Sequence, residues 1–207
     1  MTRLFLACVL LALCSAPAAA VDWLVLIVDR SNSIDLEELA LQRRAYVEVL
    51  SDPDVQAAIG DGQVALIEFD RRAELVVDWT DPASAARRYA RPRPEGLRGQ
   101  TGIGEALERA LTLLDGKPGH KVIDVSGDGP ENVDKRHLRR MRQRAYRRSI
   151  DVNCLAILTD EEPQLDRYYM DQVSTNFVMS VDKGEDFRNA LKRKLFIEVA
   201  SLQRVVQ

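Results

Sequence analysis

Apolar runs alternate along the chain with stretches in which apolar residues recur every three or four positions. Continuous runs rich in branched residues are typical of strands buried on both faces. Six segments have a strand pattern, namely residues 24–28, 64–69, 74–79, 120–126, 151–158 and 176–181. Helical periodicity predicts helices over residues 35–50, 82–91, 103–114, 135–148, 163–173 and 185–203. The alternation predicts one α/β domain with a doubly wound, mostly parallel six-stranded sheet.

One pair of strands departs from this alternation. Only the turn Asp70–Ala73 separates residues 64–69 from residues 74–79, and so short a link implies an antiparallel hairpin at the edge of the sheet. The first helix is expected to bury a single face. That face consists of Leu36, Leu39, Ala40, Val47 and Leu50. After Pro53 the helical pattern is broken, and residues 87–99, rich in Arg, Pro and Gly, are predicted to form a surface loop.

The N-terminus has the composition of a secretory signal peptide. Arg3 precedes the apolar run Leu4–Leu13, and Ala18–Ala20 offers a small-residue cleavage site. We therefore expect residues 1–20 to be removed and residues 21–207 to form the domain. An apolar run this short does not span a membrane, and the rest of the chain has no other long one. These features predict a periplasmic or secreted protein without an integral membrane segment.

Charge and cysteine content narrow the possible functions. Cleavage removes Arg3, which leaves 28 basic against 32 acidic residues and a net charge of −4, so general nucleic-acid binding is not expected. Cys154 is then the only cysteine, which excludes an intramolecular disulfide, and its apolar surroundings favour a buried side chain over a nucleophile. The arginine-rich helix 135–148 is either a solvated face or an anion-binding surface.

The first predicted strand leads directly into three oxygen-bearing side chains. Asp29, Ser31 and Ser33 occupy alternate positions after it, where open α/β sheets bind their ligands. Carboxylate and hydroxyl oxygens suit a hard divalent cation such as Mg2+. The alternative is structural, because Ser33 or Asp35 could simply cap the helix that follows.

Two further loops carry candidate ligands. Thr101 precedes a helix, where it could also serve as an N-cap, and Asp128 follows a strand between two glycines, where it could also be a turn residue. Asp124 is unusual because a charged side chain inside an apolar strand must be paired in the core or face an edge. The glycine patterns of nucleotide-binding loops do not occur.

Taken together, Asp29, Ser31, Ser33, Thr101 and Asp128 resemble the metal-ion-dependent adhesion site (MIDAS) of von Willebrand factor type A (vWA) domains. The chain is also similar to an uncharacterised family of exported bacterial vWA-like proteins. The segments that carry this similarity are Leu41–Arg43, Trp79–Thr80, Thr101–Leu107 and Val122–Gly129. It departs from the frequent pattern at Asn32, where glycine is common, and at Arg30, which is expected to point away from the ion.

The resemblance implies binding rather than catalysis. In such sites the hydroxyls contact Mg2+, or alternatively Mn2+ or Ca2+, and an open position accepts an Asp or Glu carboxylate from a partner protein. A metal-assisted phosphohydrolase would need a base near the ion, yet His120 and His137 are both expected to lie away from it. The alternatives are therefore such a hydrolase and a structural envelope protein with an empty site, while the expected function is cation-dependent protein binding.

Overall fold

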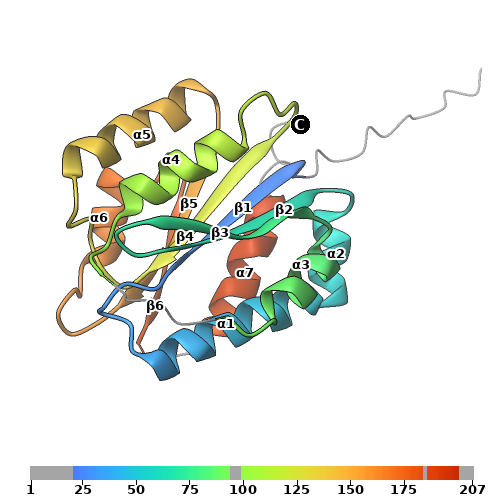
Figure 1. Ribbon diagram of the computed structural model, residues 1–207, viewed down its shortest axis with the longest axis horizontal. Coiled ribbons are helices and arrows are strands. Elements are labelled where there is room, and N and C mark those ends of the chain that lie inside the picture. The colour runs from blue at the N-terminus through green and yellow to red at the C-terminus, as the bar shows by residue number, and fades with distance from the viewer. Residues whose placement is uncertain (1–20, 94–98, 184–185, 201–207) are drawn as a thin grey trace, which may run out of the picture.

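The protein folds as a six-stranded sheet in the order β3-β2-β1-β4-β5-β6 (Figure 1). The computed structural model describes residues 21–93, 99–183 and 186–200, so the predicted signal peptide lies outside the described residues. The strands are β1 (Trp23–Asp29), β2 (Gln63–Phe69), β3 (Ala73–Thr80), β4 (Lys121–Gly127), β5 (Asp151–Leu158) and β6 (Val178–Asp182). Only β2 and β3 pair antiparallel, which confirms the predicted sheet with one antiparallel edge strand.

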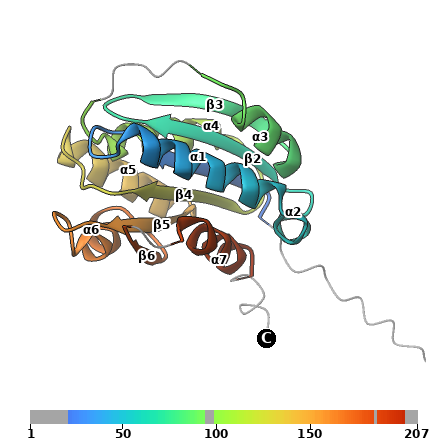
Figure 2. The same ribbon diagram turned by 90° about the horizontal axis from the view of Figure 1, so that it is seen from below.

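Helices cover both faces of this sheet (Figures 1 and 2). In the described residues they are α1 (Leu36–Ser51), α2 (Pro53–Ile59), α3 (Pro82–Tyr89), α4 (Ile103–Leu113), α5 (Lys135–Arg147), α6 (Leu165–Gln172) and α7 (Phe187–Ala200). Along β1, Val25 and Ile27 pack toward α4, α5 and α6, whereas Leu24, Leu26 and Val28 pack toward α1, α2, α3 and α7. Burial on both faces explains why this strand is apolar throughout. No helix among the described residues combines the length and apolar composition that a membrane span requires.

One expectation about the first helix was wrong. Leu36 was expected in the core, but its exposed fraction is 58%, and α1 instead buries Gln42 and Tyr46. The phenol of Tyr46 reaches across to β4 and forms a 2.7 Å hydrogen bond with the Ser126 hydroxyl. A tyrosine can thus take the place of an aliphatic residue on the buried face of α1 because the sheet offers its hydroxyl a hydrogen-bond partner.

The first helix ends just before Pro53, as predicted, but a short helix that was not predicted follows at once. Pro53 begins α2, because Asp52 caps this helix through hydrogen bonds from Asp54 N (3.0 Å) and Val55 N (3.4 Å). Proline is tolerated in the first turn, where its missing N–H has no helical partner. α3 lies within the helix predicted over residues 82–91, so the predicted surface loop begins later than residue 87. Residues 94–98 of that loop lie outside the described residues.

Candidate metal centre

Asp29 ends β1 and is fully buried. Its Oδ1 accepts a 2.7 Å hydrogen bond from Ser31 N, which fixes the turn after the strand. Its Oδ2 is also buried but has no hydrogen-bond partner among the described residues. Leaving a buried carboxylate oxygen without a partner is costly, so this atom marks a position where a positive charge would be stabilised.

A chain of hydrogen bonds links the first loop to the third. The hydroxyls of Ser31 and Ser33 are 3.0 Å apart, and Ser33 Oγ donates to Asp128 Oδ1 at 2.6 Å. Asp35, not Ser33, caps α1 by accepting a hydrogen bond from Glu38 N at 2.8 Å. The alternative that Ser33 or Asp35 caps the helix is therefore confirmed for Asp35, and Ser33 is not the cap.

Thr101 is held beside this pair by backbone contacts. Its N–H donates to Asn132 Oδ1 at 2.8 Å, and its carbonyl accepts from Asn132 N at 3.0 Å. The N-cap of α4 is Gly102, so the Thr101 hydroxyl does not cap this helix. A Cβ added to Gly129 would lie 3.6 Å from Thr101 Oγ1 and 3.9 Å from Ser33 Oγ, which places both hydroxyls beside Gly129.

These side chains border a common opening. Ser33, Thr101 and Asp128 line one cavity of about 610 Å3, with Lys183 and Glu161 at the same cavity. The structure thus brings the five predicted residues together at one edge of the sheet, with Asp29 and Ser31 behind the residues that line the cavity. Their role as metal ligands remains a prediction.

Both carboxyl groups of the site have raised pKa values. Burial, with the nearby negative charge of Asp128 adding to it, raises the pKa of Asp29 to about 8. Burial also raises the pKa of Asp128 above its usual range. Two acids whose ionised forms are disfavoured share hydroxyl neighbours, and this donor set fits a hard divalent cation.

Arg30 does not disturb this site. Its guanidinium lies 3.2 Å from Glu74 and 3.7 Å from Asp70, and both acids belong to the β2–β3 hairpin and its turn. The expectation that this cation points away from the site is confirmed.

Sequence reasoning missed two residues that support the site. Glu131 is buried in the loop after Asp128, where its carboxylate accepts hydrogen bonds from Gly104 N at 2.7 Å and from Val133 N at 2.8 Å. Its position in the loop of Asp128 was the available signal. The carboxylate therefore ties this loop to the first turn of α4.

The other missed residue is Tyr169 of α6, whose hydroxyl donates to Gly129 O at 3.1 Å. A Cβ on Gly127 would lie 2.7 Å from both Asp29 Oδ2 and the Tyr169 hydroxyl, so glycine is required there. Burial raises the pKa of Tyr169 well above its usual range, and the phenol stays protonated. In the sequence it is visible only as one of two adjacent tyrosines near the middle of a predicted helix.

The remaining polar groups singled out from the sequence lie outside this site. Asp124 is buried and its Oδ1 lies 2.6 Å from Lys194 Nζ, so it is paired in the core. Cys154 is fully buried, and burial raises the pKa of its thiol far above its usual range. His120 precedes β4 and its Nε2 lies 2.9 Å from Asp151 Oδ2. Most of the α5 arginines are exposed, namely Arg136, Arg139, Arg140, Arg144 and Arg147.

Comparison with solved structures identifies the fold. The mussel byssus proximal thread matrix protein 1, solved with a zinc-occupied MIDAS motif, aligns at a TM-score of 0.65 and 17% identity, covering 89% of this chain and 46% of that chain. A von Willebrand factor type A protein from Catenulispora acidiphila aligns at 0.62 and 17%, covering 89% and 43%. BatB, a conserved hypothetical protein from Bacteroides thetaiotaomicron, aligns at 0.64 and 17%, covering 86% and 98%. The chain spans less than half the length of the first two proteins.

These likenesses establish a vWA-type α/β fold, as the sequence resemblance predicted. A comparison with curated proteins gave no match. A family model described as "Protein of unknown function (DUF1194)" matches residues 20–203, and the chain therefore belongs to that family.

Proposed function

We propose that this protein is an exported, divalent-cation-dependent protein-binding domain that recognises a carboxylate of its partner. The observation that carries the proposal is Asp29 Oδ2, a buried carboxylate oxygen without a partner among the described residues, next to the linked hydroxyls of Ser31 and Ser33.

In this proposal the hydroxyls of Ser31, Ser33 and Thr101 contact the ion, while Asp29 and Asp128 act partly through water. Because few direct ligands are charged, bound Mg2+, Mn2+ or Ca2+ supplies an electrophilic position that an Asp or Glu side chain of a partner can occupy. Mg2+ is the first choice, since it favours oxygen ligands and retains water in its coordination shell.

The residues around the cavity support recognition of a carboxylate. The side chain of Lys183 is 49% exposed at the cavity, and its Nζ pairs with Glu38 at 3.1 Å. Its charge would attract the carboxylate, whereas Glu161 and Glu162 at the same cavity would repel partners that bring several acids. The predicted signal peptide places the encounter in the periplasm or outside the cell.

Titration calorimetry with Mg2+, Mn2+ and Ca2+ tests the metal site directly. We expect binding heat from the wild type and its loss in Asp29→Asn and Ser33→Ala. Asp171→Asn is the matched control, because it removes an acid from an exposed position of α6. Absence of binding heat in the wild type would instead favour a structural envelope protein with an empty site.

A second experiment tests the binding function. Wild-type protein should capture a partner from envelope extract in Mg2+ and release it in EDTA, whereas Asp128→Asn should capture nothing in either condition. A phosphatase assay with wild type and Asp29→Asn addresses the hydrolase alternative. Turnover that depends on Asp29 would replace the proposed binding function with a catalytic one.

A further inference from the structure

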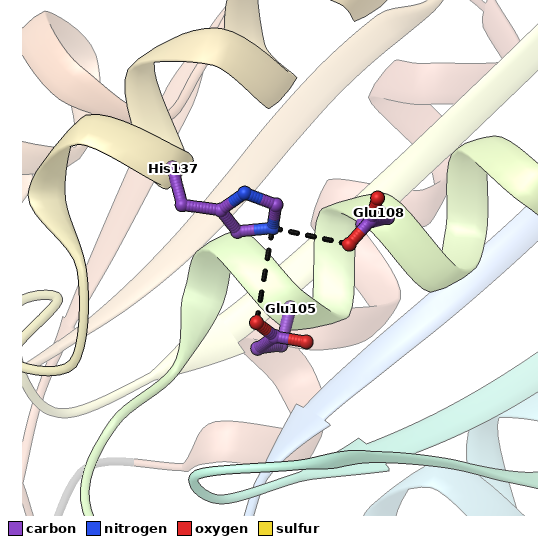
Figure 3. A group of neighbouring side chains, drawn as sticks. All are labelled: Glu105, Glu108 and His137. Atoms are coloured by element: carbon purple, nitrogen blue, oxygen red, sulfur yellow. Dashed lines mark ion pairs between the residues drawn. The ribbon is translucent and has the colours of Figure 1, made fainter.

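A second group of side chains, away from the Asp29 site, has the composition of a transition-metal site. Glu105 and Glu108 lie one turn apart on α4, and His137 faces them from α5 (Figure 3). One ligand atom from each residue lies within 4.8 Å of the other two. His137 Nε2 is 3.3 Å from Glu108 Oε2 and 3.9 Å from Glu105 Oε1.

These separations are close to those of a coordinated ion. In a tetrahedral zinc site with bonds of about 2.0–2.1 Å, neighbouring ligand atoms lie roughly 3.3–3.4 Å apart. Small rotations of the two glutamate side chains would therefore bring all three ligand atoms to bonding distance of one ion. Residues three apart on a helix share a face, so no change of the α4 backbone is needed.

The imidazole is held in place while the carboxylates are free to adjust. A Cβ added to Gly104 would lie 2.9 Å from His137 Cδ2, so the ring packs directly on the α4 backbone. The His137 side chain is 13% exposed, against 48% for Glu105 and 46% for Glu108. His137 Nε2 is buried and forms no well-aligned hydrogen bond within the described residues.

We propose that Glu105, Glu108 and His137 bind a divalent transition-metal ion, with Zn2+ as the natural occupant and water completing its coordination. The imidazole nitrogen selects Zn2+, Co2+ or Ni2+ over Mg2+ and Ca2+, which prefer oxygen ligands throughout. The cation preference of this site thus differs from that proposed for the Asp29 site, and neither proposal depends on the other.

The position of the cluster suggests what an ion would do there. α4 begins two residues after Thr101, and α5 follows the loop that carries Asp128 and Glu131. An ion bridging α4 and α5 would fix the two helices to which these loops lead. The proposed ion would therefore be structural, holding the Thr101 and Asp128 loops in register.

Arg140 gives the proposal a distinctive consequence. Its Nη2 lies 3.2 Å from His137 Nδ1, and because a guanidinium only donates, Nδ1 accepts and the ring proton resides on Nε2. Metal binding at Nε2 requires the proton to move to Nδ1, so the exposed Arg140 side chain must swing away. Replacing Arg140 by Gln should therefore raise the metal affinity severalfold, and Arg144→Gln, which removes the same charge one turn further along α5, should raise it less.

The test uses the full domain without a histidine tag. It carries Asp29→Asn so that the proposed metal site at Asp29 does not contribute to the binding signal. Zn2+ and Co2+ are titrated by calorimetry, with the visible absorption of Co2+ as a second readout. We expect one ion per chain and no competition from a hundredfold excess of Mg2+. His137→Gln and Glu108→Gln should each weaken binding at least tenfold, because even residues that only support metal ligands contribute 10–100-fold.

His120→Gln is the matched control, since it alters the other histidine of the chain and should leave the affinity unchanged. Glu108→Gln changes a half-exposed side chain, so it tests the site even if a His137 variant fails to fold. The proposal is overturned if the Asp29→Asn protein binds neither Zn2+ nor Co2+, or if Glu108→Gln binds them as the parent does.

Discussion

Two aspartates of neighbouring strands, Asp29 of β1 and Asp124 of β4, are both completely buried, yet their surroundings differ. Asp124 lies in the middle of its strand with Lys194 Nζ at 2.6 Å. Asp29 lies at the end of its strand, next to a second acid, and its Oδ2 has no partner among the described residues. Both are acidic residues in an apolar sheet, but among the described residues only Asp124 is paired with a cationic side chain.

Lys194 pairs with two buried acidic side chains. Lys194 Nζ also lies 2.5 Å from Glu198 Oε1, one turn along α7. Burial and the negative charge of Asp124 raise the pKa of Glu198 above its usual range. The difference from Asp29 indicates that Asp124 serves folding, whereas Asp29 has no cationic partner among the described residues, which is in line with the proposed metal site.

The largest expected effect comes from removing the buried ammonium group of Lys194. Lys194→Met leaves Asp124 without a counter-charge and should lower the free energy of unfolding by about 3–5 kcal/mol. Urea denaturation followed by circular dichroism measures this loss.

Lys192→Met is the matched control on the same helix. Lys192 pairs with Asp52 but is 31% exposed, and exposed ion pairs contribute about 0–1 kcal/mol. If both variants lost the same stability, the contrast between a buried and a solvated pair would be wrong for α7.

A second prediction concerns Mg2+ at the proposed Asp29 site. Mg2+ at 100 times its dissociation constant should raise the unfolding free energy of the wild type by about 2.7 kcal/mol. Asp29→Asn should abolish this increment without lowering the stability of the metal-free protein, because it removes a carboxylate that burial disfavours. Thermal unfolding with Mg2+ and with EDTA measures both quantities. A metal-free Asp29→Asn protein that is less stable than wild type would show that Asp29, like Asp124, serves folding.

The contrast between these two aspartates also shows how far sequence reasoning reaches. The strands were predictable because buried strands carry their signal in their own residues. The placement of Asp29 and Asp128 at one edge of the sheet was predictable because both lie at strand ends. Lys194 was not, because a helical lysine is ordinarily solvated and its partner lies on a distant strand. Glu131 and Tyr169 were missed for the same reason. Tyr169 contacts the backbone of Gly129, far away in sequence, and Glu131 contacts the distant backbone of Gly104 as well as its own loop. Only the closeness of Glu131 to Asp128 in the sequence was a local signal.

The third prediction concerns the close packing of Gly127 against Asp29. Gly127→Ala places a methyl group 2.7 Å from both Asp29 Oδ2 and the Tyr169 hydroxyl, and such overpacking should reduce stability by about 1–3 kcal/mol. Gly129→Ala, two residues later, meets only ordinary contacts at 3.6 and 3.9 Å and should retain stability. Its methyl group would instead enter the space beside Thr101 and Ser33 and weaken Mg2+ binding. Urea denaturation and calorimetry separate the two effects, and equal stability losses would contradict this assignment.

The smallest expected effect distinguishes support of the loop from direct metal contact. Tyr169→Phe removes the hydroxyl that donates to Gly129 O, which should lower stability by about 1 kcal/mol, the usual contribution of a single hydrogen bond. Because the hydroxyl holds the loop and is not itself a proposed ligand, Mg2+ affinity should fall less than in Ser33→Ala. Tyr146→Phe is the control, since its ring is 73% exposed on α5. If Tyr169→Phe lost Mg2+ binding as completely as Ser33→Ala, the phenol would be one of the metal ligands, and α6 would contribute directly to the metal site.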